Sequence, residues 1–183
     1  MMEFDNYRLR LIQMSDAKRL LNLIESNRDR LLKYFPITSS SIIDQETATS
    51  YISKQINETN KKEFFAYLIE EKNSNELVGM YILKSFNWRI PKCELAYFID
   101  KNHEGKGIVR KATKRIIDHC FEDLKLNKIW IETGEDNIGS KQIAVKNGFK
   151  LEGLLRQNFR DFHGNLINIE YYGFTKEDWK SNQ

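Results

Sequence analysis

The chain is poor in the residues that build disulfide-stapled, metal-binding or strongly charged proteins. Its 183 residues include two cysteines, two prolines and three histidines, and 29 Lys and Arg nearly balance 26 Asp and Glu for a net charge of +3. Cys93 and Cys120 are too few for a disulfide framework and are expected to be buried thiols. The histidines lack metal-ligand spacing, so no metal is expected. The charge excess is too small to indicate nucleic-acid binding.

Long hydrophobic runs are also missing. None approaches the roughly 18 residues of a membrane span, and Met1 to Asp5 carry no basic region followed by an apolar run. We therefore expect a cytoplasmic protein with no membrane partner. Hydrophobic residues make up 40% and charged residues 30%, which is typical of globular proteins. Because no repeat or linker divides the chain, we expect one domain over residues 1–183.

The first third of the chain indicates one strand followed by helices. Tyr7, Leu9 and Leu11 alternate with arginines, the pattern of a half-buried strand. Helical patterns follow Ser15 and cover residues 28–34, and a third helix is expected to begin at the capping residue Asp44.

The rest of the chain is richer in strands. A long helical pattern lies between two of them, and a short helix is expected to begin at Ser140 and to end at Gly148. The predicted strands are 64–70, 77–83, 93–99, 129–133, 155–162 and 166–174. The segment 93–133 reads as one βαβ unit, whereas the other strands are joined as hairpins. The fold class is therefore α+β, a mostly antiparallel mixed sheet flanked by helices.

The loop from Asn102 to Arg110 is the most informative segment. Gly105 and Gly107 allow a tight turn that gathers backbone N–H groups, and the start of the following helix adds unpaired N–H groups. Lys106 and Arg110 add positive charge. Such a loop can cradle a pyrophosphate, although a tight turn with no ligand would have the same pattern.

Together with residues downstream, this loop resembles the GNAT superfamily of acetyl-CoA-dependent N-acetyltransferases. It fits the family pattern Gln/Arg-x-x-Gly-x-Gly/Ala except that Asn102 stands first. Motifs elsewhere resemble the RimJ/RimL branch, the ribosomal-protein N-terminal acetyltransferases. They are Arg8-Leu9-Arg10, Ser15-Asp16-Ala17, Asn137-x-x-Ser140, Asn147-Gly148-Phe149, Glu152-Gly153-x-x-Arg156, His163-Gly164 and Glu177-x-Trp179. Some members of this branch carry a carboxylate where Phe159 stands here, with Asp161 two residues on.

The resemblance implies the GNAT fold, in which the central parallel strands 93–99 and 129–133 splay and admit pantetheine between them. It also implies a set of residues that bind acetyl-CoA through the open strand, the glycine loop and the thioester end. These are Phe98, Ile99, His103, Glu104, Gly105, Lys106, Gly107, Ile108, Val109, Asn137 and Ser140.

The reaction needs a base, because only a neutral amine attacks a thioester. Glu94 is the candidate base, and a salt-bridged strand carboxylate is the alternative. Ser140 is the candidate donor to the departing thiolate, although it could instead cap its helix. A backbone N–H near Phe98 or Ile99 is the candidate oxyanion donor.

The resemblance further implies an amine acceptor, foremost the N-terminal α-amino group of a ribosomal protein. A small amine such as a polyamine or an antibiotic remains an alternative, as does a non-catalytic sensor of acyl-CoA. Residues 33–44 are expected to line the acceptor groove. A homodimer is expected, because strand 166–174 carries few charges near a sheet edge; the alternative is that the final helix, 175–179, covers it.

Overall fold

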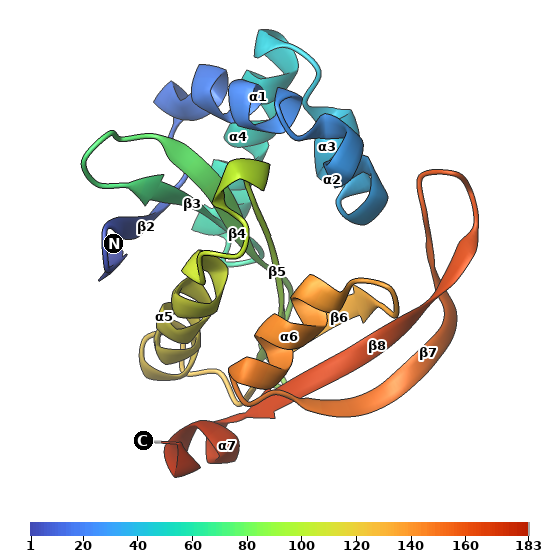
Figure 1. The fold of residues 1–183 in the computed structure, drawn as a ribbon. Helices are drawn as coiled ribbons and strands as arrows, with labels where there is room; N and C mark the ends of the chain where they lie inside the picture. Colours follow the sequence, from blue (N-terminus) through green and yellow to red (C-terminus); the bar gives the residue numbers. More distant parts are fainter. Residues whose placement is uncertain (183) are drawn as a thin grey trace.

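A computed structural model describes residues 1–182 of the chain. Eight strands form one mixed sheet in the order β1-β2-β3-β4-β5-β6-β8-β7 (Figure 1). The strands are β1 (Met2–Phe4), β2 (Tyr7–Leu11), β3 (Phe65–Glu71), β4 (Leu77–Asn87), β5 (Lys92–Ile99), β6 (Lys128–Gly134), β7 (Lys150–Arg160) and β8 (Leu166–Thr175). Neighbouring strands are antiparallel apart from β5 and β6, which are parallel. The α+β class and the mixed sheet are confirmed.

Helices cover both faces of the sheet and create two hydrophobic cores. One core joins α1 and α4 to residues such as Leu68, Met80 and Phe98. The other joins α5 and α6 to residues of the opposite strand face, such as Tyr81 and Leu95. The helices are α1 (Ala17–Glu25), α2 (Arg28–Tyr34), α3 (Pro36–Ser41), α4 (Gln45–Asn60), α5 (Ile108–Glu122), α6 (Ile138–Lys146) and α7 (Lys176–Ser181). No helix within residues 1–182 has the length and apolar character needed to cross a membrane.

The parallel pair at the centre of the sheet separates along its length. β5 and β6 pair at Lys92–Lys128, Cys93–Ile129 and Glu94–Trp130, and no pairing follows although both strands continue. Beyond Glu94 and Trp130, the backbones of the two strands are therefore open to a ligand. The predicted splayed pair is confirmed.

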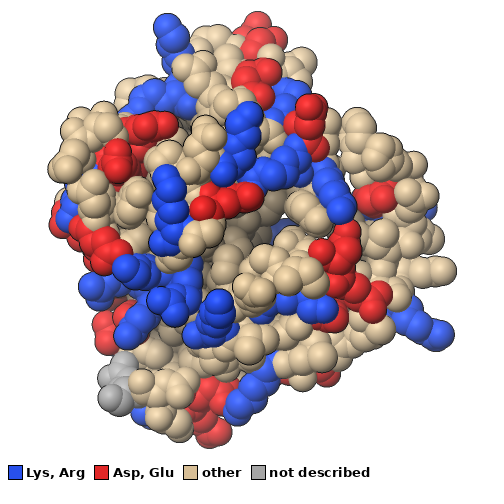
Figure 2. Space-filling model, in the orientation of Figure 1, with Lys and Arg blue, Asp and Glu red and all other residues tan. Residues whose placement is uncertain are grey.

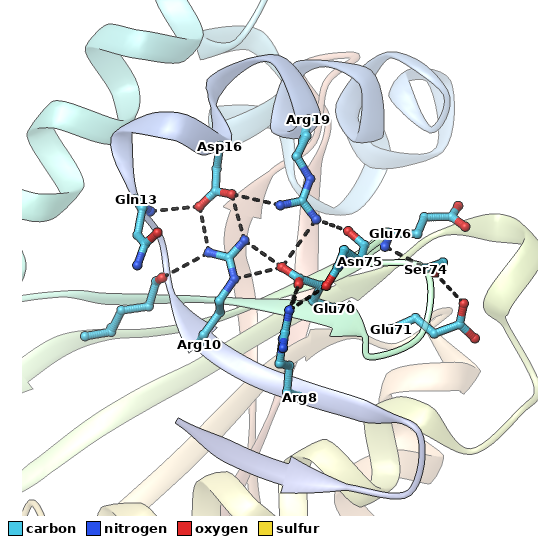
Figure 3. Close-up of polar contacts among 11 residues, drawn as sticks. Arg8, Arg10, Gln13, Asp16, Arg19, Glu70, Glu71, Ser74, Asn75 and Glu76 are labelled. Atoms are coloured by element: carbon cyan, nitrogen blue, oxygen red, sulfur yellow. Dashed lines mark hydrogen bonds and ion pairs between the residues drawn. The ribbon is translucent and has the colours of Figure 1, made fainter.

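A network of ion pairs near the amino terminus connects β2 to β3 and to the start of α1 (Figure 3). Arg10 on β2 bonds Asp16 through two contacts of 2.7 and 2.8 Å and reaches Glu70 on β3 at 2.6 Å. Arg8 also bonds Glu70, and Arg19 on α1 lies 3.3 Å from both carboxylates. Because both carboxylates are buried, their charges need this full complement of donors.

Several element boundaries differ from the sequence-based expectation. β1 and α3 were not predicted; Pro36 occupies the first turn of α3, where its missing N–H costs nothing. The helix expected to begin at Ser140 begins at Ile138, because Asn137 is its N-cap and accepts from the Ser140 N–H at 3.2 Å. β7 begins at Lys150 rather than residue 155, since two irregularities in its pairing with β8 obscure its alternation.

The second of these irregularities shapes the last hairpin. Residues 156–158 bulge opposite Asn168, with Gln157 at φ 53° and its N–H donating to Asn168 Oδ1 at 3.0 Å. Bulges bend a strand, and the hairpin rises on the side of the molecule that carries α2 and α3 (Figure 1). β8 lies between β6 and β7, so β7 is the edge strand.

Candidate active site

A cleft of about 1420 Å³ runs between α2, α3 and α4 on one side and α6 with the last hairpin on the other. Its floor is formed by β4, β5 and β6 where the parallel pair separates, and one end reaches the glycine loop before α5. Figure 2 shows the molecule hollowed at the centre of this face. The cleft exceeds the roughly 300–1,000 Å³ of ordinary small-molecule sites, so it has room for two substrates.

The open edge of β5 offers backbone groups to this cleft. The Asp100 N–H donates to Val78 O on β4 at 2.7 Å, and Ile99 is paired with Gly79. Because hydrogen bonding alternates along an antiparallel pair, the N–H and C=O of Ile99 and Tyr97 point away from β4 and toward the gap. The backbone of Phe98 points toward β4, and its side chain packs against Phe35 with ring centroids 5.6 Å apart. The Tyr97 backbone and the Ile99 N–H, rather than the Phe98 backbone, therefore face a ligand in the gap, while the Ile99 carbonyl oxygen accepts from Arg30.

The glycine loop has the geometry of an anion cradle. Gly105 and Gly107 have φ of 71° and 73°, and a Cβ added at either would meet no atom within 4 Å. Gly107 is the N-cap of α5, whose first residues are Ile108 and Val109. The loop therefore leaves open space in front of unpaired N–H groups at a helix start, and Lys and Arg side chains gather over α5 (Figure 2).

Neighbouring side chains fix the start of this loop. His103 Nδ1 lies 3.0 Å from Asp100 Oδ2, and Asn27, the N-cap of α2, donates to Asp100 Oδ1 at 2.8 Å. Burial alone would raise the pKa of Asp100, but these hydrogen bonds outweigh it and hold the pKa below its ordinary value. Arg30 of α2 contacts both the Glu104 carboxylate and the Ile99 carbonyl oxygen. Sequence reasoning missed Arg30, since nothing local marks it.

Two hydroxyl groups meet on the α6 side of the gap. Because Asn137 caps α6, the Ser140 hydroxyl is not needed as a cap, and it lies 3.1 Å from the Tyr97 hydroxyl. Burial raises the pKa of Tyr97, so its phenol stays protonated and can donate. The Thr133 hydroxyl lines the same cleft and is buried, and it has no hydrogen-bond partner among residues 1–182. The capping alternative for Ser140 was therefore wrong. Tyr97 and Thr133 are two further polar side chains on this side of the gap.

Two carboxylates lie on the other face of β5 and β6, opposite the Tyr97 and Thr133 side chains. Glu94 lies 3.0 Å from Lys84 Nζ through Oε1 and accepts from Ser85 through Oε2 at 3.1 Å. Glu132 on β6 accepts from Trp130 Nε1 at 3.1 Å. Burial raises the pKa of Glu132, and the nearby charge of Glu94 raises it further. Sequence reasoning missed Glu132, although a charged residue in a central strand was a usable signal, because such strands are normally apolar.

The walls beyond these carboxylates are largely apolar. Phe35, Pro36 and Ile37 line one side, where the structure confirms that the segment 33–44 borders the cleft. Phe159, Ile167 and Ile169 of the bent hairpin line the other. Asp161 instead closes the hairpin turn, where it binds Asn165.

The histidines do not gather at the cleft. His119, expected at the surface, is half-buried, with Nε2 2.9 Å from the Tyr67 hydroxyl and Nδ1 2.6 Å from Asp123. That expectation was wrong because α5 turns this position onto β3. His163 lies exposed in the hairpin turn. Within residues 1–182, no three His, Cys, Asp or Glu side chains are arranged to hold a metal ion.

These features fit acetyl-CoA. The extended backbone at Ile99 and Tyr97 can pair with pantetheine, and the space before Gly105 and Gly107 suits a pyrophosphate. The unpartnered Thr133 hydroxyl and the Ser140–Tyr97 pair lie along the same gap, where a thioester would end.

Comparison with known proteins supports this fit. A model of the acetyltransferase (GNAT) domain matches residues 7–150. The chain belongs to the GNAT acetyltransferase family. It is 32% identical over 177 residues to the "Putative ribosomal N-acetyltransferase YdaF" of Bacillus subtilis, covering 94% of this chain and 92% of the relative. It is 26% identical over 151 residues to the spermidine N(1)-acetyltransferase of Vibrio cholerae, covering 82% and 83%.

The fold of this GNAT chain also matches solved structures. The ribosomal-protein-S5-alanine acetyltransferase of Vibrio fischeri superimposes with a TM-score of 0.90 at 23% identity, over 97% of both chains. Membership of the family makes the protein an acetyl-CoA-dependent N-acetyltransferase. Acetyl-CoA supplies the activated acetyl group, and the residues of the cleft must bind it, receive an amine and move protons.

Proposed function

We propose that this GNAT enzyme acetylates the α-amino group at a protein N-terminus, as a ribosomal-protein acetyltransferase would. The charge balance of the cleft carries the proposal. Five acidic side chains line the cleft, and four of them already have a Lys or Arg partner. Lys54 lies 3.7 Å from Glu58, Lys84 3.0 Å from Glu94 and Lys33 2.7 Å from Asp136, while Arg30 pairs with Glu104.

Glu132 is the remaining acidic side chain of the cleft lining, and it has no ion pair among the described residues. A substrate with one ammonium group therefore finds one free carboxylate. A polyamine carries further ammonium groups, which would each lose solvation in the cleft without gaining a free anion. The apolar walls at Phe35 and Ile37 and at Ile167 and Ile169 suit the first side chains of a peptide better than a polycation.

The proposed roles of individual residues follow the geometry. The loop Gly105–Val109, which includes Lys106, binds the pyrophosphate, and His103 and Glu104 lie at its border. Ile99 pairs with pantetheine, and Asn137 positions Ser140, whose hydroxyl donates to the departing thiolate. Glu94 borders the amine site, and its pairing with Lys84 matches the salt-bridged alternative for this residue.

Purified protein, acetyl-CoA and a thiol-reactive dye test the activity. Octapeptides that begin with Ser, Ala or Met are the substrates, and the same peptides with a blocked N-terminus and a Lys side chain are the matched controls. Spermidine and spermine test the polyamine alternative. We expect thiol release only with free N-termini and none with the Gly107→Val variant. Turnover with spermidine but no peptide would contradict the proposal, and tight acetyl-CoA binding with no turnover on any amine would indicate a sensor.

Mass spectrometry then identifies the acceptor. Protein N-termini from cells with and without this enzyme are compared, and loss of acetylation at a ribosomal protein is the expected result. Unchanged N-termini throughout would contradict a ribosomal-protein substrate.

We also propose that residues 1–183 act as one domain in the cytoplasm and form a homodimer. The edge strand β7 exposes Leu151, Leu154 and Leu155, a surface that a second copy could shield. α7 packs against α5 instead, where Trp179 stacks on Phe121 with centroids 5.6 Å apart. Light scattering at micromolar protein tests the dimer, and a mass of 21.7 kDa at every concentration would contradict it.

A further inference from the structure

We propose that Glu132, rather than Glu94, receives the substrate ammonium group and removes its proton. This rests on the acetyltransferase activity and holds for any amine acceptor. Both carboxylates project from the same face of the separated strands, the face opposite the Tyr97 side chain. Glu94 is paired with Trp130, and Glu132 lies two residues further along β6. They differ in what surrounds them.

Glu94 is engaged at both oxygens. Lys84 binds one at 3.0 Å, and the Ser85 hydroxyl donates to the other at 3.1 Å. Both oxygens of Glu94 therefore already have partners, one of them a cation, so a substrate ammonium group would have to compete with Lys84 and Ser85 for them.

Glu132 is held in place but not neutralised. Trp130 Nε1 donates to Oε1 at 3.1 Å, and the indole is itself fixed by stacking on Tyr171 with centroids 5.8 Å apart. This leaves Oε2 available at the point where β5 and β6 have separated. The position is one residue before Thr133, whose buried hydroxyl has no partner in the described residues.

Burial and the negative charge of Glu94 favour proton uptake by Glu132, against the opposing charges of the nearby lysines. Burial is the main reason that its pKa is raised, and the charge of Glu94 adds to it, while the Trp130 hydrogen bond and Lys84 act in the opposite direction. Lys92 and Lys128 lie over the rings of Trp130 and Tyr171, 5.3 and 5.5 Å from the centroids. A base works best when its pKa approaches the operating pH.

The proton balance is simple. The ammonium group gives one proton to Glu132, and the neutral nitrogen attacks the thioester carbonyl carbon. The C–N bond forms, the C–S bond breaks, and the second nitrogen proton ends on the departing sulfur. Glu132 returns its proton to water, so the products are the amide, the thiol and one released proton.

Kinetics on the intact enzyme test the assignment, with the peptide or polyamine that the wild type accepts. Glu132→Gln should reduce kcat/KM by about 100-fold or more at pH 7 and abolish the acid limb of the pH profile. Glu94→Gln should retain more than a tenth of the activity. Its acid limb should move to lower pH, because the charge that raises the pKa of Glu132 is gone.

Glu3→Gln is the matched control, because Glu3 is an exposed strand carboxylate on β1, at the far end of the sheet and outside the cleft lining. Its kcat/KM should equal that of the wild type. The opposite order, in which Glu94→Gln abolishes activity and Glu132→Gln retains it with an intact acid limb, would overturn the proposal.

A second measurement needs no acceptor, so it stands even if the proposed N-terminal substrate is wrong. Protein labelled with ¹³C at the glutamate carboxyls is titrated by NMR, and the resonances are assigned by their loss in Glu132→Gln and Glu94→Gln. We expect the Glu132 resonance to titrate above the ordinary glutamate pKa and to shift downward in Glu94→Gln. A Glu132 resonance that titrates at or below the ordinary glutamate pKa would contradict the proposal.

Discussion

Two clusters of carboxylates in this enzyme differ in how completely their charges are compensated. In the amino-terminal network, Asp16 and Glu70 share three arginines, Arg8, Arg10 and Arg19 (Figure 3). Burial alone would raise the pKa of both carboxyls, but the arginine hydrogen bonds outweigh it and lower the pKa of each. We therefore expect this network to stabilise the folded state.

In the cleft, Glu94 and Glu132 have one ion-pair partner between them in the described part of the chain, Lys84. The pKa of Glu132 is raised instead, because burial and the neighbouring charge exceed what Trp130 and Lys84 provide. Burial raises the carboxyl pKa in both clusters, so the direction of the net shift follows from how many cations and hydrogen bonds oppose it. A perturbed carboxylate in a cleft is where chemistry is expected.

The largest expected effect comes from breaking the compensated cluster. Glu70→Gln leaves three arginines with one carboxylate between them and should lower the free energy of unfolding by about 3–5 kcal/mol, as loss of one partner of a buried ion pair does. Urea denaturation at pH 7 measures it. The exposed Glu76→Gln on the same hairpin should change stability by less than about 0.5 kcal/mol. Equal effects of the two variants would show that the network contributes nothing.

A neutral polar pair in the cleft sharpens the comparison from the functional side. Ser140→Ala should lower kcat about 10- to 100-fold and leave the acetyl-CoA Kd unchanged, because the thiolate it serves forms only during the reaction. Tyr97→Phe should have a smaller effect, since its hydroxyl acts through Ser140 at 3.1 Å. Stopped-flow turnover and calorimetry separate the two constants. A weakened Kd with unchanged kcat would assign Ser140 to coenzyme binding.

Acid should weaken the amino-terminal cluster. The folded-state pKa of Asp16 and Glu70 is lowered, so their contribution is present above the unfolded values near 4 and is lost as the pH falls through the folded values. The unfolding free energy should drop by on the order of 1–2 kcal/mol between pH 5 and pH 3. Urea denaturation at both pH values should show that the unfolding free energy of Glu70→Gln falls less with pH than that of the wild type. An equal fall in the two proteins would mean that Glu70 is not the group responsible.

Removing Lys84, the ion-pair partner of Glu94, should raise the pKa of Glu132 further above that of the carboxyls in the amino-terminal network. Lys84→Met should move the acid limb of kcat/KM to higher pH, because Lys84 lowers the pKa of Glu132. Stability should change by less than about 1 kcal/mol, since the Lys84 side chain is 42% exposed. A pH profile and a thermal melt of the same preparation test both statements. An unmoved acid limb would separate Lys84 from the base.

Local sequence signals predicted much of this enzyme. The glycine loop and the helix start near Ser140 depend on residues close together in the chain, such as Gly105, Gly107 and Asn137, whereas the splayed parallel pair was expected from the resemblance to the GNAT family. Glu132 and Tyr97 were missed because what sets them apart comes from other elements: the charge of Glu94 on β5 for Glu132, and Ser140 of α6 for Tyr97. The start of α6 was predicted at Ser140 instead of directly after Asn137 because Ser and Asn are both favoured N-cap residues, and the sequence alone did not distinguish them.

Glu132→Gln and Glu70→Gln unfolded in parallel urea series at pH 7 test the central claim most directly. A raised folded-state pKa means that ionised Glu132 opposes folding at neutral pH, so Glu132→Gln should raise the unfolding free energy by less than about 1 kcal/mol while turnover is lost. Glu70→Gln should lower it. If Glu132→Gln instead destabilised the protein as Glu70→Gln does, Glu132 would be a compensated structural carboxylate, which would contradict its role as the base.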